Sequence, residues 1–338
     1  GTGYDNQYRN MGETENKGFE ASVNWIAIDK KNFGLSFGAN ISFNKNKIKS
    51  LGSLKTMSND LTQSYWASSE IGQDYWIEVG GSVGKMYGYV SDGRYEVSDF
   101  ERYDEVTETW ILRDGVSSSS AVGTARPGMM KLKDLDNSGD ANGSDDKRVI
   151  GDANPLHTGG FNINARLYGF DLTANFNWSY GNDIYNANKI EYTSTSKYLY
   201  RNLTSDMAGG KRWNNVDAAG NLVTNMAQLA EMNQNTTMWS PYTDKYIFSD
   251  WAVEDGSFLR LNTLTLGYTM PTTLVKKVGI NNLRFYVTAY NVFCLTSYSG
   301  YDPEVSTSRR NGSNLTPGVD YSAYPKSRQF VVGLNLNF

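Results

Sequence analysis

One loop of the sequence has the spacing of oxygen ligands found in calcium-binding loops. Side-chain oxygens stand at positions 1, 3, 5 and 12 of the loop, which are Asp134, Asp136, Ser138 and Asp145, and the backbone carbonyl at position 7 belongs to Asp140. Hard oxygen ligands so arranged, together with a backbone carbonyl, can surround Ca2+. Asp145 stands where a glutamate is usual. The alternative is a solvated acidic turn held by hydrogen bonds to its own backbone.

Carboxylates elsewhere in the chain are poorly arranged for catalysis. Glycoside hydrolysis needs two carboxyl groups that face one another across a cleft. Glu254 and Asp255 are adjacent, and neighbouring residues of a strand point to opposite faces. The chain has a single histidine, His157, and a single cysteine, Cys294, which leaves little for zinc, histidine-based catalysis or an internal disulfide. We therefore expect a protein that is not an enzyme and requires no cofactor, with Ca2+ in the acidic loop as the one candidate ion.

Aromatic residues are frequent in the long polar segments of the chain. Flat rings stack on sugar rings and on peptide groups, so they suit the binding of oligomers. The candidates for substrate binding are Trp66, Tyr185, Trp213 and Trp239. Further aromatics in these segments are Tyr75, Trp76, Tyr192, Tyr198, Tyr200 and Tyr242. The alternative is that the rings pack the loops together or lie in aromatic belts at membrane interfaces.

The elements that carry these loops are predicted to be β-strands, because apolar and polar residues alternate along several segments. One predicted hairpin joins residues 19–27 to 35–44. A second joins 161–167 to 170–178, and a single strand is predicted at 283–290. The strand 258–268 changes phase near Asn262 and Thr263, which predicts a bulge.

Strands of about ten residues with one apolar face match a tilted crossing of a membrane. The apolar face is expected to point to lipid, because a slip of one residue would place Glu20, Asp171 and Arg284 there instead. The residues expected on the lipid side are Phe19, Val23, Trp25, Phe37, Ile41, Phe176, Phe285, Val332 and Leu334. A transmembrane helix is not predicted, since no window of about 18 residues is continuously apolar.

The connections between the predicted strands alternate between short and long. The short ones are 29–32, 168–169 and 270–282, and the long ones run roughly over 45–75, 95–156, 181–254 and 297–324. Tight periplasmic turns and long extracellular loops are typical of outer-membrane barrels. A compact soluble domain rarely contains several loops of more than about 15 residues.

The last segment of the chain alternates as well and ends on an aromatic residue. Its apolar positions are Phe330, Val332, Leu334, Leu336 and Phe338. Gly333, Leu336 and Phe338 fit a pattern that resembles the assembly signal of outer-membrane proteins, Gly-x-x-apolar-x-aromatic. Phe338 is expected at the periplasmic rim of a barrel and Phe330 near the opposite interface.

A series of short motifs resembles the SusC-like TonB-dependent transporters of Bacteroidetes. In chain order they are Asn16-Lys17-Gly18-Phe19-Glu20, Val79-Gly80 with Met86-Tyr87-Gly88-Tyr89, Pro127-Gly128 with Lys133–Asp136 and Ile150–Pro155, Glu254–Leu261, Leu266–Pro271, Gly300–Val305 and Tyr324–Arg328. Each motif is weak alone, and their common order over nearly the whole chain makes the resemblance specific.

The resemblance implies the fold, function and partners. Residues 1–338 are expected to be the C-terminal portion of an all-β, transmembrane antiparallel barrel, contributing about nine of about 22 strands. By the same resemblance, the plug, the TonB box and the N-terminal strands are expected to lie outside this chain. The expected function is TonB-dependent uptake of oligomeric nutrients, glycans before peptides, across the outer membrane of a Gram-negative bacterium. The expected partners are a SusD-like surface lipoprotein that acts as a lid, TonB, the remainder of the barrel and outer-membrane lipid.

Two other classes of protein remain as alternatives. A soluble β-sandwich that binds carbohydrate also has alternating strands and loop aromatics. A passive porin formed by this chain alone conflicts with an odd number of strands, since bacterial single-chain barrels have an even number. Nucleic acid is not an expected partner, because the 36 acidic and 32 basic residues are interspersed and form no basic stripe.

Overall fold

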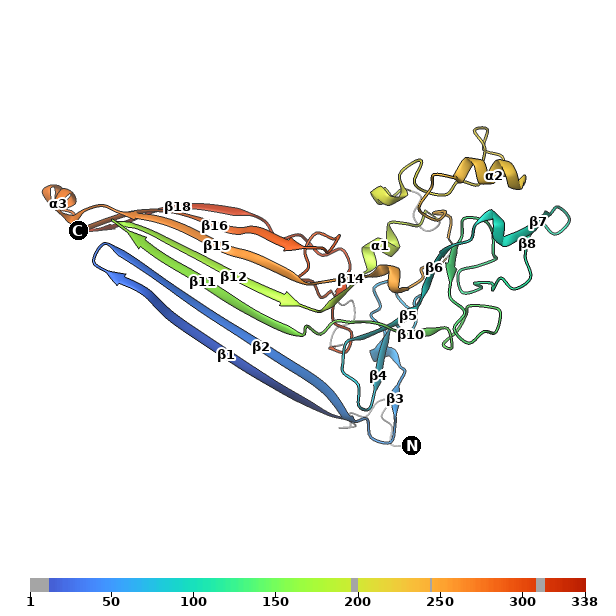
Figure 1. Cartoon of the computed structure of the whole chain (residues 1–338), viewed down its shortest axis with the longest axis horizontal. Coiled ribbons are helices and arrows are strands. Elements are labelled where there is room, and N and C mark those ends of the chain that lie inside the picture. Colours follow the sequence, from blue (N-terminus) through green and yellow to red (C-terminus); the bar gives the residue numbers. More distant parts are fainter. Residues whose placement is uncertain (1–11, 196–199, 244, 308–313) are drawn as a thin grey trace, which may run out of the picture.

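A seven-stranded antiparallel sheet forms the elongated part of the molecule (Figure 1). The structure is a computed structural model that describes residues 12–195, 200–243, 245–307 and 314–338. The strands of the sheet are β1 (Glu13–Lys30), β2 (Phe33–Ser50), β11 (His157–Leu167), β12 (Phe170–Tyr180), β15 (Phe258–Thr269), β16 (Asn282–Thr296) and β18 (Gln329–Asn337). They pair in this order, each with its neighbours along the chain, which is the meander expected of alternating turns and loops.

Tight connections gather at one end of the sheet, where the C-terminus also lies (Figure 1). The predicted turn at Tyr168 and Gly169 is confirmed, and both residues have positive φ, 47° and 91°. Two successive positive φ values are the geometry of a type I′ hairpin turn, which matches the twist of the flanking strands. The third short connection contains α3 (Thr272–Val275) and the 3-10 turn η5 (Lys276–Val278).

The predicted bulge at Asn262 is confirmed. Asn175 pairs with Thr263 and the next residue, Phe176, pairs with Leu261, so Asn262 is the extra residue of β15. The pairing of β15 with β16 is irregular at the same place, between Leu261 and Thr263. The bulge explains how both halves of β15 present leucines to the same face although their phase differs in the sequence.

The remaining strands are short and lie beyond the other end of the sheet (Figure 1). They are β3 (Thr56–Met57), β4 (Tyr75–Glu78), β5 (Lys85–Tyr89), β6 (Ser91–Arg94), β7 (Phe100–Asp104), β8 (Thr109–Leu112), β9 (Met130–Leu132), β10 (Lys147–Asp152), β13 (Asp183–Asn186), β14 (Val253–Asp255) and β17 (Val319–Asp320). Helical turns between them are η1 (Asp60–Thr62), η2 (Val97–Asp99), α1 (Ala187–Glu191), η3 (Ser205–Met207), α2 (Met226–Asn233) and η4 (Asp250–Ala252). We call this part of the molecule, residues 51–156, 181–257 and 297–328, the loop region.

The expectation of about nine membrane strands is wrong for the described residues, which place seven strands in the sheet. The long connections expected at 45–75 and 95–156 leave residues 75–95 between them as room for a further crossing. There β4 has 4 residues and β5 has 5, and both belong to a small sheet with β3 and β10. A tilted crossing needs about 9–11 residues, so these strands are too short to span a membrane. The two long loops expected on either side of them are therefore one continuous segment, 51–156.

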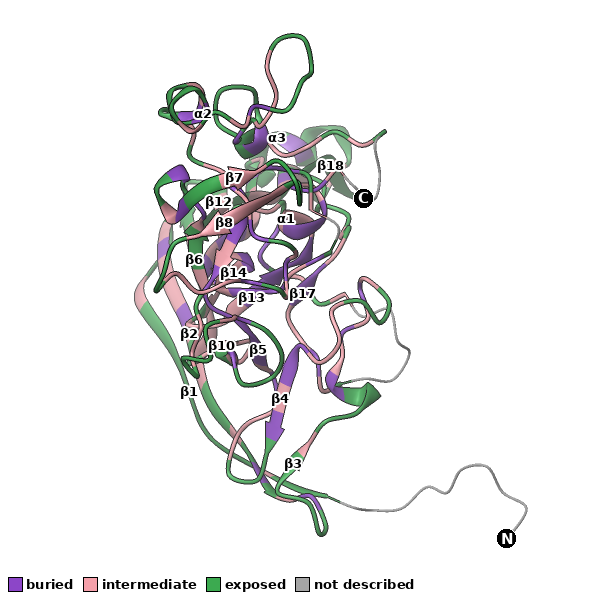
Figure 2. Ribbon diagram, turned by 90° about the vertical axis from the view of Figure 1, so that its right-hand side faces the viewer, coloured by how far each residue is buried: buried purple, intermediate pink, exposed green. Residues whose placement is uncertain are grey.

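Most of the buried core lies in the loop region, and only a few buried hydrophobic residues lie on the sheet. Figure 2 shows the buried residues gathered there, while β1 is largely exposed. Two of the core clusters centre on fully buried aromatics, one on Tyr95 and Phe100 and the other on Trp66, Tyr75 and Tyr185. The loop region is therefore a packed unit with its own hydrophobic core, and the sheet carries its apolar residues on the outside. Among the described helices, none is long and apolar enough to cross a membrane.

Candidate functional site: the two faces of the sheet and the loop region

The register of the sheet brings the predicted apolar residues onto one face. Trp25 pairs with Phe37, and Phe37 pairs with Ile163 on its other side. Across the last strands Phe285 pairs with Leu334. All nine residues expected on the lipid side share this face, here called the outer face: Phe19, Val23, Trp25, Phe37, Ile41, Phe176, Phe285, Val332 and Leu334. Val332 is 80% exposed, so the described chain leaves this face open to a surrounding medium.

The opposite face, here called the inner face, is polar. Asparagines recur on it across neighbouring strands and bond to one another: Asn262 Nδ2 donates to Asn177 Oδ1 (2.7 Å), and Asn164 Nδ2 donates to Asn162 Oδ1 (2.9 Å). Arg284 also lies here, paired with Asp171 at 2.6 Å. This placement confirms the prediction that Arg284 and Asp171 point away from the apolar face. On that face the two charged side chains would lie among leucines and phenylalanines.

A buried arginine ties the inner face to the segment that follows β16. Arg260 is 2% exposed, and its guanidinium contacts Asp302 Oδ1 at 2.7 Å and Glu304 Oε2 at 2.9 Å. Glu304 also pairs with Lys326, near the start of β18. Asn291, which has a φ of 50°, accepts a hydrogen bond from Arg260 and donates one to the Lys326 carbonyl (3.0 Å). These contacts hold both ends of the segment against the wall of the sheet.

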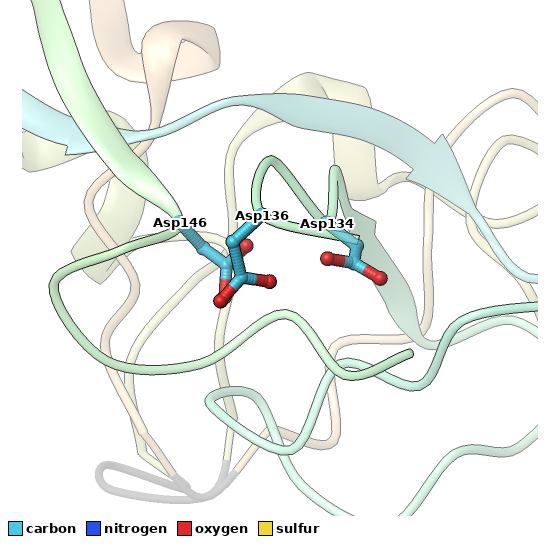
Figure 3. A group of neighbouring side chains, drawn as sticks. All are labelled: Asp134, Asp136 and Asp146. Carbon is cyan, nitrogen blue, oxygen red and sulfur yellow. The ribbon is translucent and has the colours of Figure 1, made fainter. Parts of the chain in front are cut away.

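The acidic loop gathers only some of the residues predicted to bind Ca2+. Side-chain oxygens of Asp134, Asp136 and Asp146 lie within 4.8 Å of one another (Figure 3). Asp145, the residue predicted at the twelfth position, is exposed and lies outside this group, while Asp146 is buried. Asp146 accepts hydrogen bonds from the backbone N–H groups of Leu135 and Asn142, both at 2.7 Å. The structure therefore shifts the last carboxylate of the group by one position.

The other two predicted ligands have different roles. Asp140 accepts hydrogen bonds from the hydroxyls of Ser118 and Ser120 and from the Ser120 N–H (2.8 Å). Burial alone would raise its pKa, but these hydrogen bonds outweigh it and lower the pKa to about 2. The Ser138 hydroxyl donates to the Asp140 carbonyl at 3.2 Å. Ca2+ binding by this loop stays a prediction, with Asp146 a better-placed ligand than Asp145, Asp140 or Ser138.

The four aromatics predicted to bind substrate are all buried in the loop region. Trp66, Tyr185, Trp213 and Trp239 are each at most 5% exposed. The indole N–H of Trp66 donates to the Tyr185 hydroxyl at 2.6 Å, and Trp213 lies under the Arg94 guanidinium at 4.6 Å. Because a stacking platform needs an accessible ring face, this placement does not support substrate contact by these residues. They form the hydrophobic cores that hold the loops together.

The remaining loop aromatics differ in exposure. Tyr75 is fully buried, Trp76 and Tyr192 are half-buried, and Tyr200 and Tyr242 are exposed. Tyr198 lies outside the described residues. Exposed rings therefore occur in the loop region, although not at the positions selected from the sequence.

Comparison with known proteins finds similar sequences along the whole chain. The chain is 31% identical over 339 residues to TonB-dependent receptor P3 of Formosa agariphila and 25% identical over 349 residues to TonB-dependent receptor SusC of Bacteroides thetaiotaomicron. Both alignments include 100% of this chain. The chain is homologous to the SusC-like TonB-dependent receptors. It spans about 30% of the length of P3 and 28% of that of SusC. No protein-family model matches the chain.

Solved structures agree with the fold of this chain. The RagAB peptide importer in its closed-closed state superposes with a TM-score of 0.67 at 20% identity, over 98% of this chain and 30% of that one. The all-β, antiparallel barrel architecture is therefore confirmed, with the seven-stranded sheet as part of the barrel wall. All of these relatives are named receptors or transporters, in agreement with the expectation of a non-enzymatic protein.

Three of the motifs that resemble SusC-like transporters meet in the Arg260 network. The motif 300–305 supplies Asp302 and Glu304, and the motif 324–328 supplies Lys326. Arg260 itself lies in the motif 254–261, between two outward leucines. Sequence reasoning missed the network, although a lone arginine within a Leu-Arg-Leu alternation is a signal that an inward charge needs a partner.

A buried carboxyl in the loop region also escaped the sequence. Asp74 is 1% exposed and accepts two hydrogen bonds from Ser64, one from its N–H at 2.8 Å and one from its hydroxyl. Burial raises the pKa of Asp74 to about 7, although the hydrogen bonds from Ser64 oppose the shift. Nothing in the local sequence distinguishes Asp74 from the exposed aspartates, because its burial depends on packing by distant segments.

Proposed function

We propose that this chain forms part of the wall of an outer-membrane transporter that takes up oligomeric nutrients, glycans or peptides, in a TonB-dependent manner. The observation that carries the proposal is the two-faced sheet in a chain homologous over its full length to TonB-dependent receptors. An apolar outer face stabilises the wall in lipid, and a polar inner face lines a path for polar solutes. The packed loop region beyond the sheet lies on the extracellular side in this proposal.

The partners of the proposed transporter follow from the same comparison. A SusD-like surface lipoprotein would close the loop region as a lid, and TonB would act on a part of the transporter outside this chain. The relatives named TonB-dependent receptors support TonB as a partner, and the similarity to the RagAB peptide importer supports peptides as well as glycans among the substrates. The remaining partners in this proposal are the rest of the barrel and the lipid of the outer membrane.

The soluble β-sandwich is the weaker alternative. A sandwich buries the apolar face of one sheet against a second sheet. In the described part of the chain, the other sheets have two to four short strands and lie beyond one end of the large sheet (Figure 1). The apolar face of the large sheet is therefore left exposed. Contact with lipid accounts for such a face, whereas contact with water does not.

Uptake by living cells tests the proposal. Cells with the gene, cells without it and cells that lack TonB function are supplied with fluorescent oligosaccharides and oligopeptides. We expect accumulation of at least one oligomer only where both the gene and TonB are present. Equal accumulation in all three strains for every oligomer would contradict the proposal. Recovery of the full-length protein in the soluble fraction without detergent would favour the sandwich instead.

A further inference from the structure

Lysines gather at the loop-region end of the hairpin formed by β1 and β2. Lys17 pairs with Lys45, two residues beyond the pair of Phe19 with Phe43. Residues two apart on a strand share a face, so both lysines lie on the outer face in line with the two phenylalanines. Lys47 follows Lys45 on the same face, and all three lysines are exposed. The outer face therefore changes from apolar to basic at this end of the hairpin.

These lysines lie at the height expected of lipid headgroups. Two residues at about 3.4 Å of rise each, on a strand tilted by about 40°, place Lys17 and Lys45 roughly 5 Å above the phenylalanines along the membrane normal. Beside Phe43 lies the ring of His157, at 5.5 Å, which stacks on Tyr180 at 5.1 Å. Aromatic residues are enriched at the interface between hydrocarbon and headgroups. The lysine side chains are long enough to carry their ammonium groups into the headgroup layer.

The positive charge at this end of the hairpin is only partly neutralised by the protein. Residues 13–17 and 45–49 contain four lysines and two glutamates, which leaves a net charge of +2. Glu15 contacts Lys17 at 3.1 Å and Lys49 at 3.6 Å. One carboxylate is thus shared by two of the lysines, and the other two depend on a partner from outside the hairpin.

The arrangement of the lysines favours an anion between them. In the described part of the chain, no ion pair includes Lys45 or Lys47. Lys17 lies directly opposite Lys45, and like charges in such a cross-strand pair destabilise the sheet. A bound anion would remove this repulsion, because it attracts the ammonium groups of both strands at once.

The position of the lysines indicates what kind of anion this is. Phe19 and Phe43 face lipid in the proposed orientation, so the space in front of the neighbouring lysines is the edge of the bilayer. The outer leaflet of a Gram-negative outer membrane consists of glycolipids whose sugar headgroups carry phosphate. Lysine clusters beside a membrane attract anionic headgroups, and a lysine ammonium is a common partner of phosphate. An acidic protein segment would instead bind on the water side of the loop region.

We infer that Lys17, Lys45 and Lys47 bind the phosphate of an outer-leaflet glycolipid at the extracellular edge of the barrel wall. The acyl chains of this lipid lie along the apolar part of the outer face, over Phe19 and Val23, while its headgroup contacts the lysines. The inference rests on the outer-membrane location in the proposed function. It adds a lipid ligand on the outside of the wall, away from the path of the transported solute.

The test titrates the full-length receptor, purified in detergent, with lipid A and measures the bound lipid by native mass spectrometry. We expect the native receptor to bind lipid A. The variant K17Q/K45Q/K47Q should weaken this binding by roughly tenfold or more, as expected for the loss of three charges beside an anionic headgroup. K17R/K45R/K47R keeps the three charges and should retain most of the affinity.

Controls separate the effect of this surface from that of overall charge. K55Q/K133Q/K211Q removes three exposed lysines of the loop region and should bind lipid A as the native receptor does. Lipid A without its phosphates should bind the native receptor much more weakly than lipid A itself. Phosphatidylglycerol carries a phosphate on a different lipid and should also bind more weakly.

The outcomes separate this inference from the proposed function. Equal affinity of the native receptor and K17Q/K45Q/K47Q for lipid A would overturn the inference, and so would equal binding of phosphate-free lipid A or of phosphatidylglycerol by the native receptor. Each of these results leaves the proposed function standing if native cells accumulate an oligomer. Lipid A binding that depends on the lysines, in cells that show no uptake, would support the inference and contradict the function. Gel mobility before and after heating shows whether each variant is folded.

Discussion

Arg260 links the wall of the sheet to the segment between its last two strands. Its side chain is 3% exposed and that of Asp302 is 8% exposed, so the pair is almost entirely withdrawn from water. A charge buried in this way is stable only beside a partner of opposite charge, because an unpaired charge would lose its hydration without compensation. The network therefore couples the position of the segment to one residue of β15.

Replacing Arg260 by alanine should release the segment 297–328. The variant leaves Asp302 without its cation, and removal of one partner from a buried pair costs about 3–5 kcal/mol. We expect faster proteolysis within this segment of the full-length receptor, read by mass spectrometry. R102A is the control, because Arg102 is 56% exposed and lies 3.8 Å from Asp104, and exposed pairs contribute at most about 1 kcal/mol. Equal protection of the segment in both variants would contradict the argument.

Asp74 makes the loop region sensitive to pH. Its pKa in the folded protein is about 7, above the ordinary value of 3.8. Between these two values the folded state binds more protons than the unfolded state, so stability falls as the pH rises through this window. The loss is on the order of 4 kcal/mol, since one pKa unit corresponds to about 1.4 kcal/mol.

Hydrogen exchange of residues 60–75 in the full-length receptor measures this effect. After correction for the intrinsic exchange rate, we expect less protection at pH 8 than at pH 5. D74N should remove most of the difference, because an amide carries no charge at either pH. The exposed Asp114 provides the control, as D114N should leave the dependence unchanged. Protection that increases from pH 5 to pH 8 in the native protein would refute the assignment.

At the scale of elements, the sheet was largely predictable and the loop region was not. The hairpins follow from alternation, the turn from Tyr168-Gly169 and the bulge from the change of phase at Asn262, all of which are local. Strand β10 pairs with β5 across about sixty residues, and the contact of Trp66 with Tyr185 spans 119. Such contacts depend on the packing of distant segments, which alternation within one segment does not encode. This is why short loop strands were taken as membrane strands and core aromatics as substrate contacts.

The outer face of β18 gives the most direct test of orientation. Val332 lies near the middle of the strand, and Arg at a lipid-facing midplane position costs roughly 2–4 kcal/mol. We expect V332R to reduce the folded fraction of the full-length receptor in outer membranes, measured by gel mobility with and without heating. N335R places the same charge on the inner face of the same strand and should fold nearly as well as the native protein. A stronger folding defect in N335R than in V332R would show that the inner and outer faces have been assigned the wrong way round.

The acidic loop offers a choice between two neighbouring carboxylates. If Ca2+ binds where Asp134, Asp136 and Asp146 converge, the ion should raise the melting temperature of the full-length receptor, and a chelator should lower it. D134N/D136N should abolish the response to Ca2+, whereas D145N should retain it. Loss of the Ca2+ response in D145N would instead support the ligand set predicted from the spacing, which includes Asp145. No response in the native receptor would leave the loop as a hydrogen-bonded acidic turn.

At the scale of the whole molecule, the sheet is open. In the described part of the chain, β1 and β18 are its edges, and each pairs with one neighbour only. Closing seven strands on themselves would give a barrel below the smallest bacterial size of about eight strands, and an odd one. In lipid the free edges would leave backbone N–H and C=O groups without partners, at several kcal/mol for each group.

Residues 1–338 expressed alone should therefore fail to form a stable barrel. We expect the fragment, directed to the outer membrane with a signal peptide, to be degraded or to remain unfolded, with no change in gel mobility on heating. The full-length receptor from the same vector is the positive control and should show the change. Closure needs further strands that pair with β1 and β18, and the relatives, of which this chain spans about 30%, have the length to supply them. A heat-modifiable, protease-resistant fragment would show that the two edges can pair with each other or with a second copy.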